Sequence, residues 1–312
     1  MTKTWHRPTL WLAAVMAVLT LGTVVGLLVD DRVIQGSSVW LKPFKFTLSL
    51  AVYSATLSWM LSLPHKGKRW TSGLASAIAL ILFVEVGLVV VQGARGAFTH
   101  YNTSHDAFNQ TVQFAFRFIM VMFALNIVLA AILTFQRATG DRPTFHAVRA
   151  GLYLAITGMA LGYLMIFNFG QKTTAVDAEG RTAKLVGAHS VGVPDGGEGM
   201  PVTAWSTTGG DLRVPHFVGM HGLQVMIVVA LLTARLADRN RLRVVLVAAA
   251  GYAGLLALLT WQALRAEPLV KPGATTLATA GGLAFATALG VLWAVRSGRA
   301  TPTPTPRPVL QR

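Results

Sequence analysis

Residues 72–94, SGLASAIALILFVEVGLVVVQGA, form an apolar run with a single charged side chain, that of Glu85. An α-helix rises about 1.5 Å per residue, so a run of this length suffices to cross the hydrocarbon core of a bilayer, about 30 Å thick. We therefore expect this stretch to be a transmembrane helix, and we expect its glutamate to lie inside the membrane.

Other apolar segments of similar length accompany it on both sides. Of the 312 residues, 53% are hydrophobic and 12% are charged, which is more apolar content than one water-soluble core requires. The sequence predicts an all-α polytopic membrane protein, a bundle of about eight transmembrane helices. The predicted spans are 9–29, 44–63, 72–94, 112–135, 148–168, 217–235, 244–264 and 275–295.

The same pattern predicts how the chain is divided. Residues 1–296 form a single transmembrane domain, and its one long connection is a glycine-rich outer loop at 169–215. A connection of that length without structure of its own is typically functional, a lid, or disordered. Residues 297–312 are interrupted by prolines and cannot continue a helix, so we expect a disordered cytoplasmic tail.

The basic residues predict the orientation. The chain carries 27 Lys and Arg against 12 Asp and Glu, a net charge of +15. With the N-terminus in the cytoplasm, the inner segments hold sixteen basic and two acidic residues, whereas the outer segments hold ten and nine. The positive-inside rule then places both termini in the cytoplasm and the protein in the plasma (inner) membrane. These cations indicate contact with anionic lipid at the cytoplasmic face, and no nucleic-acid binding.

Two charged residues, Glu85 and Arg117, fall inside predicted spans. By helix rise they lie about 12 Å and about 9 Å below the outer ends of their helices, so they can meet. An ionisable side chain at such depth is costly unless it is paired or hydrated. Two interpretations stay open: a structural ion pair between adjacent helices, or the floor of a functional site.

Polar side chains recur at helical spacing in three neighbouring spans. They occupy one stripe in each span, which predicts a polar pocket in the outer half of the membrane. In the second span the Ser, Thr and Tyr members can equally serve as helix-to-helix hydrogen bonds. The stripes are Lys45, Ser49, Tyr53 and Thr56; Glu85, Gln92 and Arg95; and Asn109, Gln113 and Arg117.

The stretch GGDLRVPHFVGMHGLQ, residues 209–224, opens the sixth predicted span. Pro215 suits the first helical position, and His221 shares a helix face with Gln224. A histidine in the first turns of a span is expected to face the bundle, and Arg213 to lie on the outer approach. The predicted ligand-binding residues are Glu85, Arg117, His221, Gln224, Arg95, Lys45 and Arg213.

Histidines near the outer face raise the alternative of a metal or haem site. The candidate ligands are His100, His105, His216 and His221. The last two are five residues apart, about 140° around a helix, and cannot chelate together from one face. Haem b requires two axial histidines on facing spans, and a zinc hydrolase requires three N or O ligands with an activated water. Haem and zinc therefore stay open as cofactors. Cysteine is absent, which excludes thiolate ligands and disulfides.

Three motifs carry a resemblance: VWLKPFKFTLSLAVYSATLSWML, residues 39–61; VQGARGAFTHYNTSHDAFN, residues 91–109; and WSTTGGDLRVPHFVGMHGLQ, residues 205–224. With them the chain resembles a group of uncharacterised bacterial integral membrane proteins. The resemblance implies a polytopic inner-membrane protein and lends weight to several polar residues without giving any of them a role. These are Lys42, Lys45, Arg95, His105, Asp211, Arg213, His216, His221 and Gln224.

The function expected from the sequence is binding of a small or lipidic ligand in the outer polar pocket, with Glu85 and Arg117 at its floor and His221 on its wall. Two alternatives stand beside it. One is a haem- or metal-dependent membrane enzyme that uses the outer histidines. The other is a transporter in which Glu85 and Arg117 act as an intramembrane switch.

Overall fold

The protein is an all-α membrane protein. The computed structural model describes residues 5–63, 65–99, 102, 106–135, 141–166 and 172–297. Ten helices occupy this part of the chain: α1 (Arg7–Val29), α2 (Leu41–Ser62), α3 (Lys68–Ala94), α4 (Ala107–Phe116), α5 (Phe118–Phe135), α6 (Arg142–Ile166), α7 (Arg213–Met220), α8 (Gly222–Leu232), α9 (Asp238–Leu264) and α10 (Ala274–Arg296).

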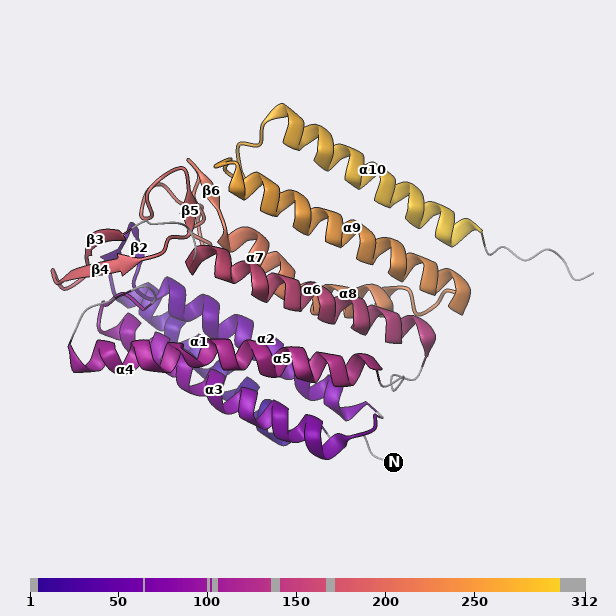
Figure 1. Ribbon diagram of the computed structural model, residues 1–312, viewed down its shortest axis with the longest axis horizontal. Coiled ribbons are helices and arrows are strands. Elements are labelled where there is room, and N and C mark those ends of the chain that lie inside the picture. The colour runs from indigo at the N-terminus through magenta and orange to yellow at the C-terminus, as the bar shows by residue number, and fades with distance from the viewer. Residues whose placement is uncertain are drawn as a thin grey trace, which may run out of the picture.

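Short strands in the described residues pair into three antiparallel two-stranded sheets. The pairs are β1 (Val33–Ile34) with β2 (Ser37–Ser38), β3 (Lys172–Val176) with β4 (Thr182–Val186), and β5 (Ser190–Val191) with β6 (Gly210–Asp211). All of them lie at one end of the helical bundle, which we call the strand end (Figure 1). The predicted outer loop at 169–215 therefore contains structure of its own from residue 172 onward.

Most of the helices are long and apolar enough to cross a membrane. Six candidates meet this requirement in the described residues, and the pair α7 and α8 makes a seventh if its 44° bend lies within one span. The second predicted span, helix α2, is the exception. It has 22 residues, but its buried face carries Thr47, Ser54 and Ser58, so its polarity is turned toward its neighbours.

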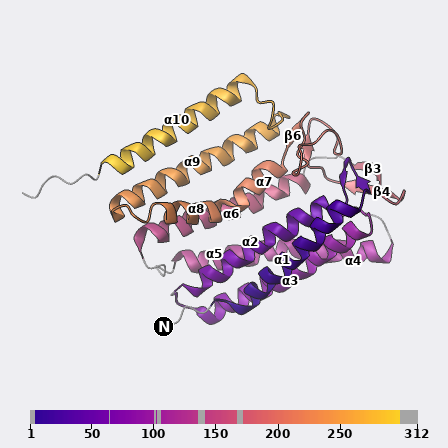
Figure 2. The ribbon, with the colours of Figure 1, turned by 180° about the vertical axis from the view of Figure 1, so that it is seen from behind.

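The helices lie side by side in two groups (Figures 1 and 2). The first group is α1 to α5 and the second is α6 to α10, with α6 at the boundary. Val148 and Leu152 of α6 belong to the core of the first group, whereas Ala147 and Leu154 belong to the core of the second. Helix α6 thus joins the two groups by burying side chains on both of its faces.

The described chain begins and ends at the same end of the bundle, opposite the strands. Helix α1 starts there and α10 finishes there (Figure 1). A chain with both ends on one side crosses the bundle an even number of times. If α4 with α5 and α7 with α8 each count as one pass, the helices make eight passes, the number predicted from the sequence. The predicted tail lies outside the described residues from 298 onward.

Glycines set the contact between α6 and α7. A Cβ atom at Gly158 would lie 2.2 Å from the amide nitrogen of Met220 and 2.3 Å from the carbonyl carbon of Gly219. The two backbones can approach this closely only without a side chain at that position, as in other small-residue contacts between membrane helices. The contact fixes α7 against α6 directly below the strand end.

Candidate functional site

A tight loop of eight residues, 199–206, approaches the helices from the strand end; we call it the tip loop. Gly199 bridges to Ser206, and within the loop the Met200 amide donates to the Trp205 carbonyl at 2.8 Å. The Ala204 amide donates back to the Met200 carbonyl, also at 2.8 Å. These bonds close the loop on itself, so its tip projects as one compact unit.

The tip loop contacts two helices near the strand end. Lys45 of α2 donates from Nζ to the Thr203 carbonyl at 2.7 Å, and the Trp205 ring packs edge-on against Phe217 of α7, with centroids 5.8 Å apart. Lys45 and Phe217 each lie four residues into their helix, about 6 Å along its axis. Because α2 packs on α1 and α3 while α7 packs on α6 and α9, the tip bridges the two helical groups.

Arg213, the first residue of α7, holds the other side of the tip. Its Nη2 donates to the Ala204 carbonyl at 2.6 Å, and its Nε donates to Asp211 Oδ1 at 2.9 Å. Asp211 in turn accepts the Ser206 amide at 2.8 Å, which anchors the base of the loop. The guanidinium therefore divides its donors between a carboxylate and a neutral main-chain oxygen.

A third cation completes the group. The half-buried ammonium of Lys42 lies 5.9 Å from the centre of the Phe46 ring and has no hydrogen-bond partner in the described residues. Its charge acts on those of both Lys45 and Arg213. We call Lys42, Lys45 and Arg213 the cation cluster.

The counter-charge comes from a loop carboxylate, Asp195. It accepts the amides of His189 and Ser190 and the Nδ1–H of His189, the last at 2.8 Å. Burial opposes ionisation of Asp195, but these hydrogen bonds outweigh it and hold its pKa below the usual range. Burial also lowers the pKa of His189, so the ring is neutral at neutral pH.

The sixth span is broken at His221, where α7 ends and α8 begins with a bend of 44°. Tyr252 of α9 donates from its hydroxyl to the Val218 carbonyl at 2.7 Å, just before the break. The His221 ring packs on Phe217, with centroids 4.4 Å apart. Its Nε2 is buried without a hydrogen-bond partner, as is Oε1 of Gln224. The two predicted pocket residues thus expose unpaired polar atoms to the interior of the bundle.

Glu85 and Arg117 do not form the expected contact. Glu85 is 5% exposed, its Oε1 has no hydrogen-bond partner, and its charge acts on Tyr163 of α6. Arg117 lies between α4 and α5 with its side chain exposed, and no ion pair joins it to Glu85 in the described residues. Its position is five residues, about 140° around the helix, from Val112, which α4 buries. Equal depth therefore did not bring the two charges to the same face.

Arg95, also predicted to bind ligand, belongs to a separate network. Its Nη1 donates to Gln92 Oε1 at 2.9 Å, and its guanidinium lies 4.1 Å from the centre of the Phe108 ring. Gln92 is fully buried and donates to Asn109 Oδ1 at 2.7 Å. These contacts tie α3 and α4 together near the strand end and leave Arg95 engaged away from the tip loop.

The predicted metal ligands are only partly covered by the structure. His100 and His105 lie outside the described residues. His216 Nδ1 donates to the Gly158 carbonyl at 2.7 Å, so one ring nitrogen is already used in the α6–α7 contact. Across the described ranges, no three His, Asp or Glu side chains form a group suited to a metal ion.

The site that emerges combines two predicted residues, Lys45 and Arg213, with partners that the spacing analysis did not include. Asp195 and the carbonyl oxygens of the tip loop sit in the predicted outer loop, where helical periodicity gives no information. One signal was present: MPVTAW, residues 200–205, is an apolar run inside a polar, glycine-rich connection. Such a run indicates a segment that contacts apolar surroundings.

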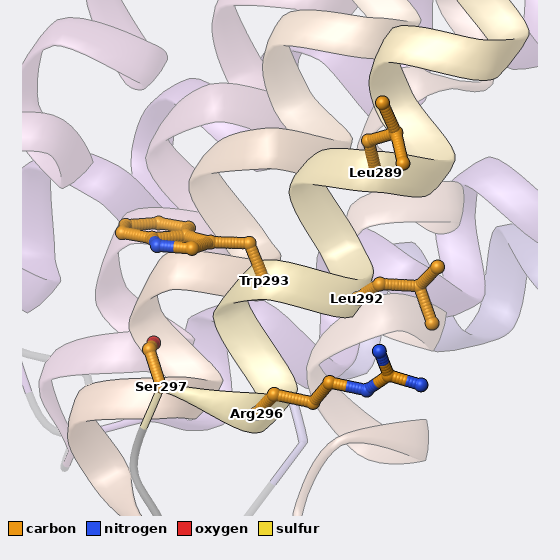
Figure 3. A pocket seen from close by; sticks show the side chains of 5 residues that line it. All are labelled: Leu289, Leu292, Trp293, Arg296 and Ser297. Carbon is orange, nitrogen blue, oxygen red and sulfur yellow. The ribbon is translucent and has the colours of Figure 1, made fainter.

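An open surface groove of about 420 Å³ lies elsewhere, on α10 at the opposite end of the bundle. Figure 3 shows its lining side chains, Leu289, Leu292, Trp293, Arg296 and Ser297, with Leu292 and Arg296 directed away from Trp293. The Arg243 guanidinium lies 4.9 Å from the Trp293 ring centre, a pairing typical of the membrane interface.

Comparison with protein-family models, with curated proteins and with solved structures finds no match for the chain.

Proposed function

We propose that the protein binds the anionic group of a small or lipidic ligand at the cation cluster. The observation that carries this proposal is the pair of bonds from Lys45 and Arg213 to the Thr203 and Ala204 carbonyls. The partner of Lys45 has the right geometry but no charge, and Arg213, already paired with Asp211, extends one further bond to a neutral main-chain oxygen. The tip loop thus occupies the positions that the oxygen atoms of a carboxylate or phosphate would take.

The energetics favour that exchange. A hydrogen bond between a cation and an anion is roughly twice as strong as one between neutral groups, and a planar guanidinium can grip two oxygens at once. Lys42 has no hydrogen-bond partner in the described residues, and the Thr203 hydroxyl is buried without one. An anion at this place would therefore supply acceptors that the resting structure lacks.

Transport of the bound ligand is a second candidate. It is favoured by the break at His221, because discontinuous helices with free polar groups form the binding sites of many transporters. The unpaired atoms of His221 and Gln224 lie below the cation cluster, four and seven residues further into the span than Phe217. They would offer a next position to a ligand that moves inward.

We also propose that the end opposite the strands faces the cytoplasm and meets anionic lipid in a plasma membrane. This is supported by the exposed basic side chains that gather at that end. In the described residues they include Lys66, Lys68, Arg69, Arg235 and Arg239.

The test is anion-dependent stabilisation of the purified protein in a neutral detergent. Thermal unfolding is followed while inorganic phosphate or phosphatidylglycerol is added, with sodium chloride at equal ionic strength as the reference. A bound anion should raise the Tm of the wild type and of Lys271→Gln, whose cation lies exposed at the strand end outside the cluster. Lys45→Gln should lose this response and Lys45→Arg should keep it. An equal response in Lys45→Gln would disprove anion binding at the cluster.

A further inference from the structure

We infer that the ligand of the cation cluster is an anionic amphiphile from the membrane leaflet at the strand end. Its headgroup would be held by Lys42, Lys45 and Arg213, and its hydrocarbon chain would lie against Val202 and Phe217. This inference rests on the proposed anion site and names the class of ligand that fits it.

The first support is the composition of the tip. Of residues 200–205, only Thr203 is polar, and the Val202 side chain at the apex is 66% exposed. Surface turns in water are ordinarily built from Gly, Pro, Asn, Asp and Ser, of which residues 200–205 contain only Pro201. An exposed valine is favourable where its surroundings are hydrocarbon, and the tip contacts Lys45 and Phe217, each four residues into its helix. The apex is thus placed to contact lipid.

The second support is the surface beside the cations. Phe217 of α7 is 39% exposed and Phe46 of α2 is 37% exposed, so both helices present aromatic rings at the level of the cluster. Lys42 lies over the Phe46 ring. Apolar walls with cations at the interface suit a molecule that carries a charge at one end and a chain at the other. A free phosphate ion would gain nothing from these rings.

The third support is a route by which the ligand enters the site. Between α2 and α7, the tip loop supplies the bonds that cross from one helical group to the other, through Lys45 and Arg213. Val202 and Ala204 adopt φ values of +66° and +53°, which are unfavourable for residues with a Cβ. The loop's own main-chain bonds and its bonds to the two cations together hold this conformation. A headgroup that replaced the bonds to the cations would free the loop from α2 and α7 and open the space between these helices toward lipid.

The test separates the contribution of the anionic headgroup from that of the hydrocarbon chain of the lipid. Protein in phosphatidylcholine nanodiscs is titrated with dioleoylphosphatidylglycerol, and bound lipid is counted by native mass spectrometry. Glycerol 3-phosphate serves as the soluble competitor with the same anionic group. We expect site-specific lipid binding that weakens roughly fivefold in Lys45→Gln, persists in Lys45→Arg and Lys271→Gln, and resists a large excess of glycerol 3-phosphate.

Two outcomes would overturn it in different ways. If glycerol 3-phosphate displaces the lipid at equal concentration, the chain contributes nothing and the amphiphile is wrong, while the anion site stands. If lipid binding is the same in Lys45→Gln as in the wild type, and phosphate does not stabilise the wild type either, the anion site itself is wrong.

A second measurement tests the placement of the tip without relying on affinity. Since the chain has no cysteine, a spin label can be attached at Val202→Cys alone. In nanodiscs this label should be more accessible to dissolved oxygen than to a water-soluble nickel chelate. A label at Glu198→Cys, exposed before the tip loop, should show the reverse order. Preference for the nickel chelate at position 202 would place the tip in water and remove the lipid contact.

Discussion

At the scale of single residues, Val202 shows how the tip loop departs from a relaxed turn. It is β-branched and has φ +66°, in the left-handed region where the Cβ collides with the backbone. The conformation costs about 1–2 kcal/mol per residue, and Ala204 at φ +53° adds to it. The loop's own main-chain bonds and the bonds from Lys45 and Arg213 together sustain this strain, which links the closed loop to the cation cluster.

Replacing Val202 by glycine should stabilise the closed loop. Glycine adopts positive φ freely. Its greater conformational freedom in the unfolded chain costs about 0.5–1 kcal/mol of stability, which offsets part of this gain. We expect Val202→Gly to unfold at a higher temperature than Val202→Ala, which removes the same branched side chain but keeps the unfavourable φ. Thermal unfolding in detergent measures the difference. Equal midpoints for the two variants would mean that the loop is not strained at this residue.

The His189–Asp195 pair makes stability depend on pH. Burial lowers the pKa of His189 from 6.5, and Arg213 and Lys42 act in the same direction, against the bond to Asp195. The folded protein therefore takes up fewer protons than the unfolded chain, and the stabilisation is complete above pH 6.5 and falls as the pH drops through 6.5 toward the folded pKa. The lowered pKa of Asp195 affects stability only below about pH 3.8, the ordinary pKa of an aspartate side chain.

We expect the midpoint of thermal unfolding to be lower at about pH 5 than at about pH 7.5. Other histidines contribute to that difference, so the comparison is made with His189→Gln, which keeps a hydrogen-bond donor for Asp195 but cannot titrate. The variant should show a smaller drop between the two pH values. A drop as large as that of the wild type would show that His189 is not protonated in this range.

The sequence anticipated Lys45 and Arg213, because a cation near the outer end of a span must find a partner or water. It did not anticipate that Glu85 and Arg117 would face different surroundings. Depth along a helix follows from counting residues, whereas the direction of a side chain depends on how each helix is rotated and where it breaks. Arg117 lies about 140° around the helix from buried Val112, and which face of α4 is buried is known only once the helices are packed.

At the scale of elements, the packing of α6 on α7 rests on Gly158. A methyl group there would lie 2.2 Å from the Met220 amide nitrogen, against backbone that cannot yield as a flexible side chain would. The same contact brings His216 to the Gly158 carbonyl and lies directly before the break at His221. The spacing of polar and charged residues gives no information on this contact, which became visible only with the fold.

Gly158→Ala should therefore destabilise the protein by about 1–3 kcal/mol, the usual range for overpacking. The matched control is Gly87→Ala in α3, where a Cβ would meet nothing within 4 Å. Alanine there should be neutral or stabilising by up to about 1 kcal/mol, from helix propensity alone. Thermal unfolding of both variants in one detergent makes the comparison. If the two substitutions had the same effect, the α6–α7 contact would have to be looser than the structure has it.

At the scale of the whole molecule, hydropathy predicted the bundle well because helices satisfy their own backbone hydrogen bonds in lipid. The limit of the method is visible in α2, whose buried Thr47, Ser54 and Ser58 make it less apolar than the other spans. A helix enclosed by protein on its polar side need not look apolar in sequence. The structure within the predicted outer loop was not predicted either. Short strands and a tip loop that turns back toward the helices leave no periodic pattern in the sequence.

The orientation of the bundle can be tested directly, because the chain has no cysteine and any single cysteine reports its own position. Lys66→Cys is exposed between α2 and α3 at the end opposite the strands, and Glu198→Cys is exposed at the strand end. With basic residues retained on the cytoplasmic side, a membrane-impermeant maleimide added to intact cells should label position 198 and not 66. Lysed cells should label both, which controls for reactivity. Labelling of position 66 in intact cells would invert the orientation and place the cation cluster, with its lipid-facing tip, in the cytoplasmic leaflet.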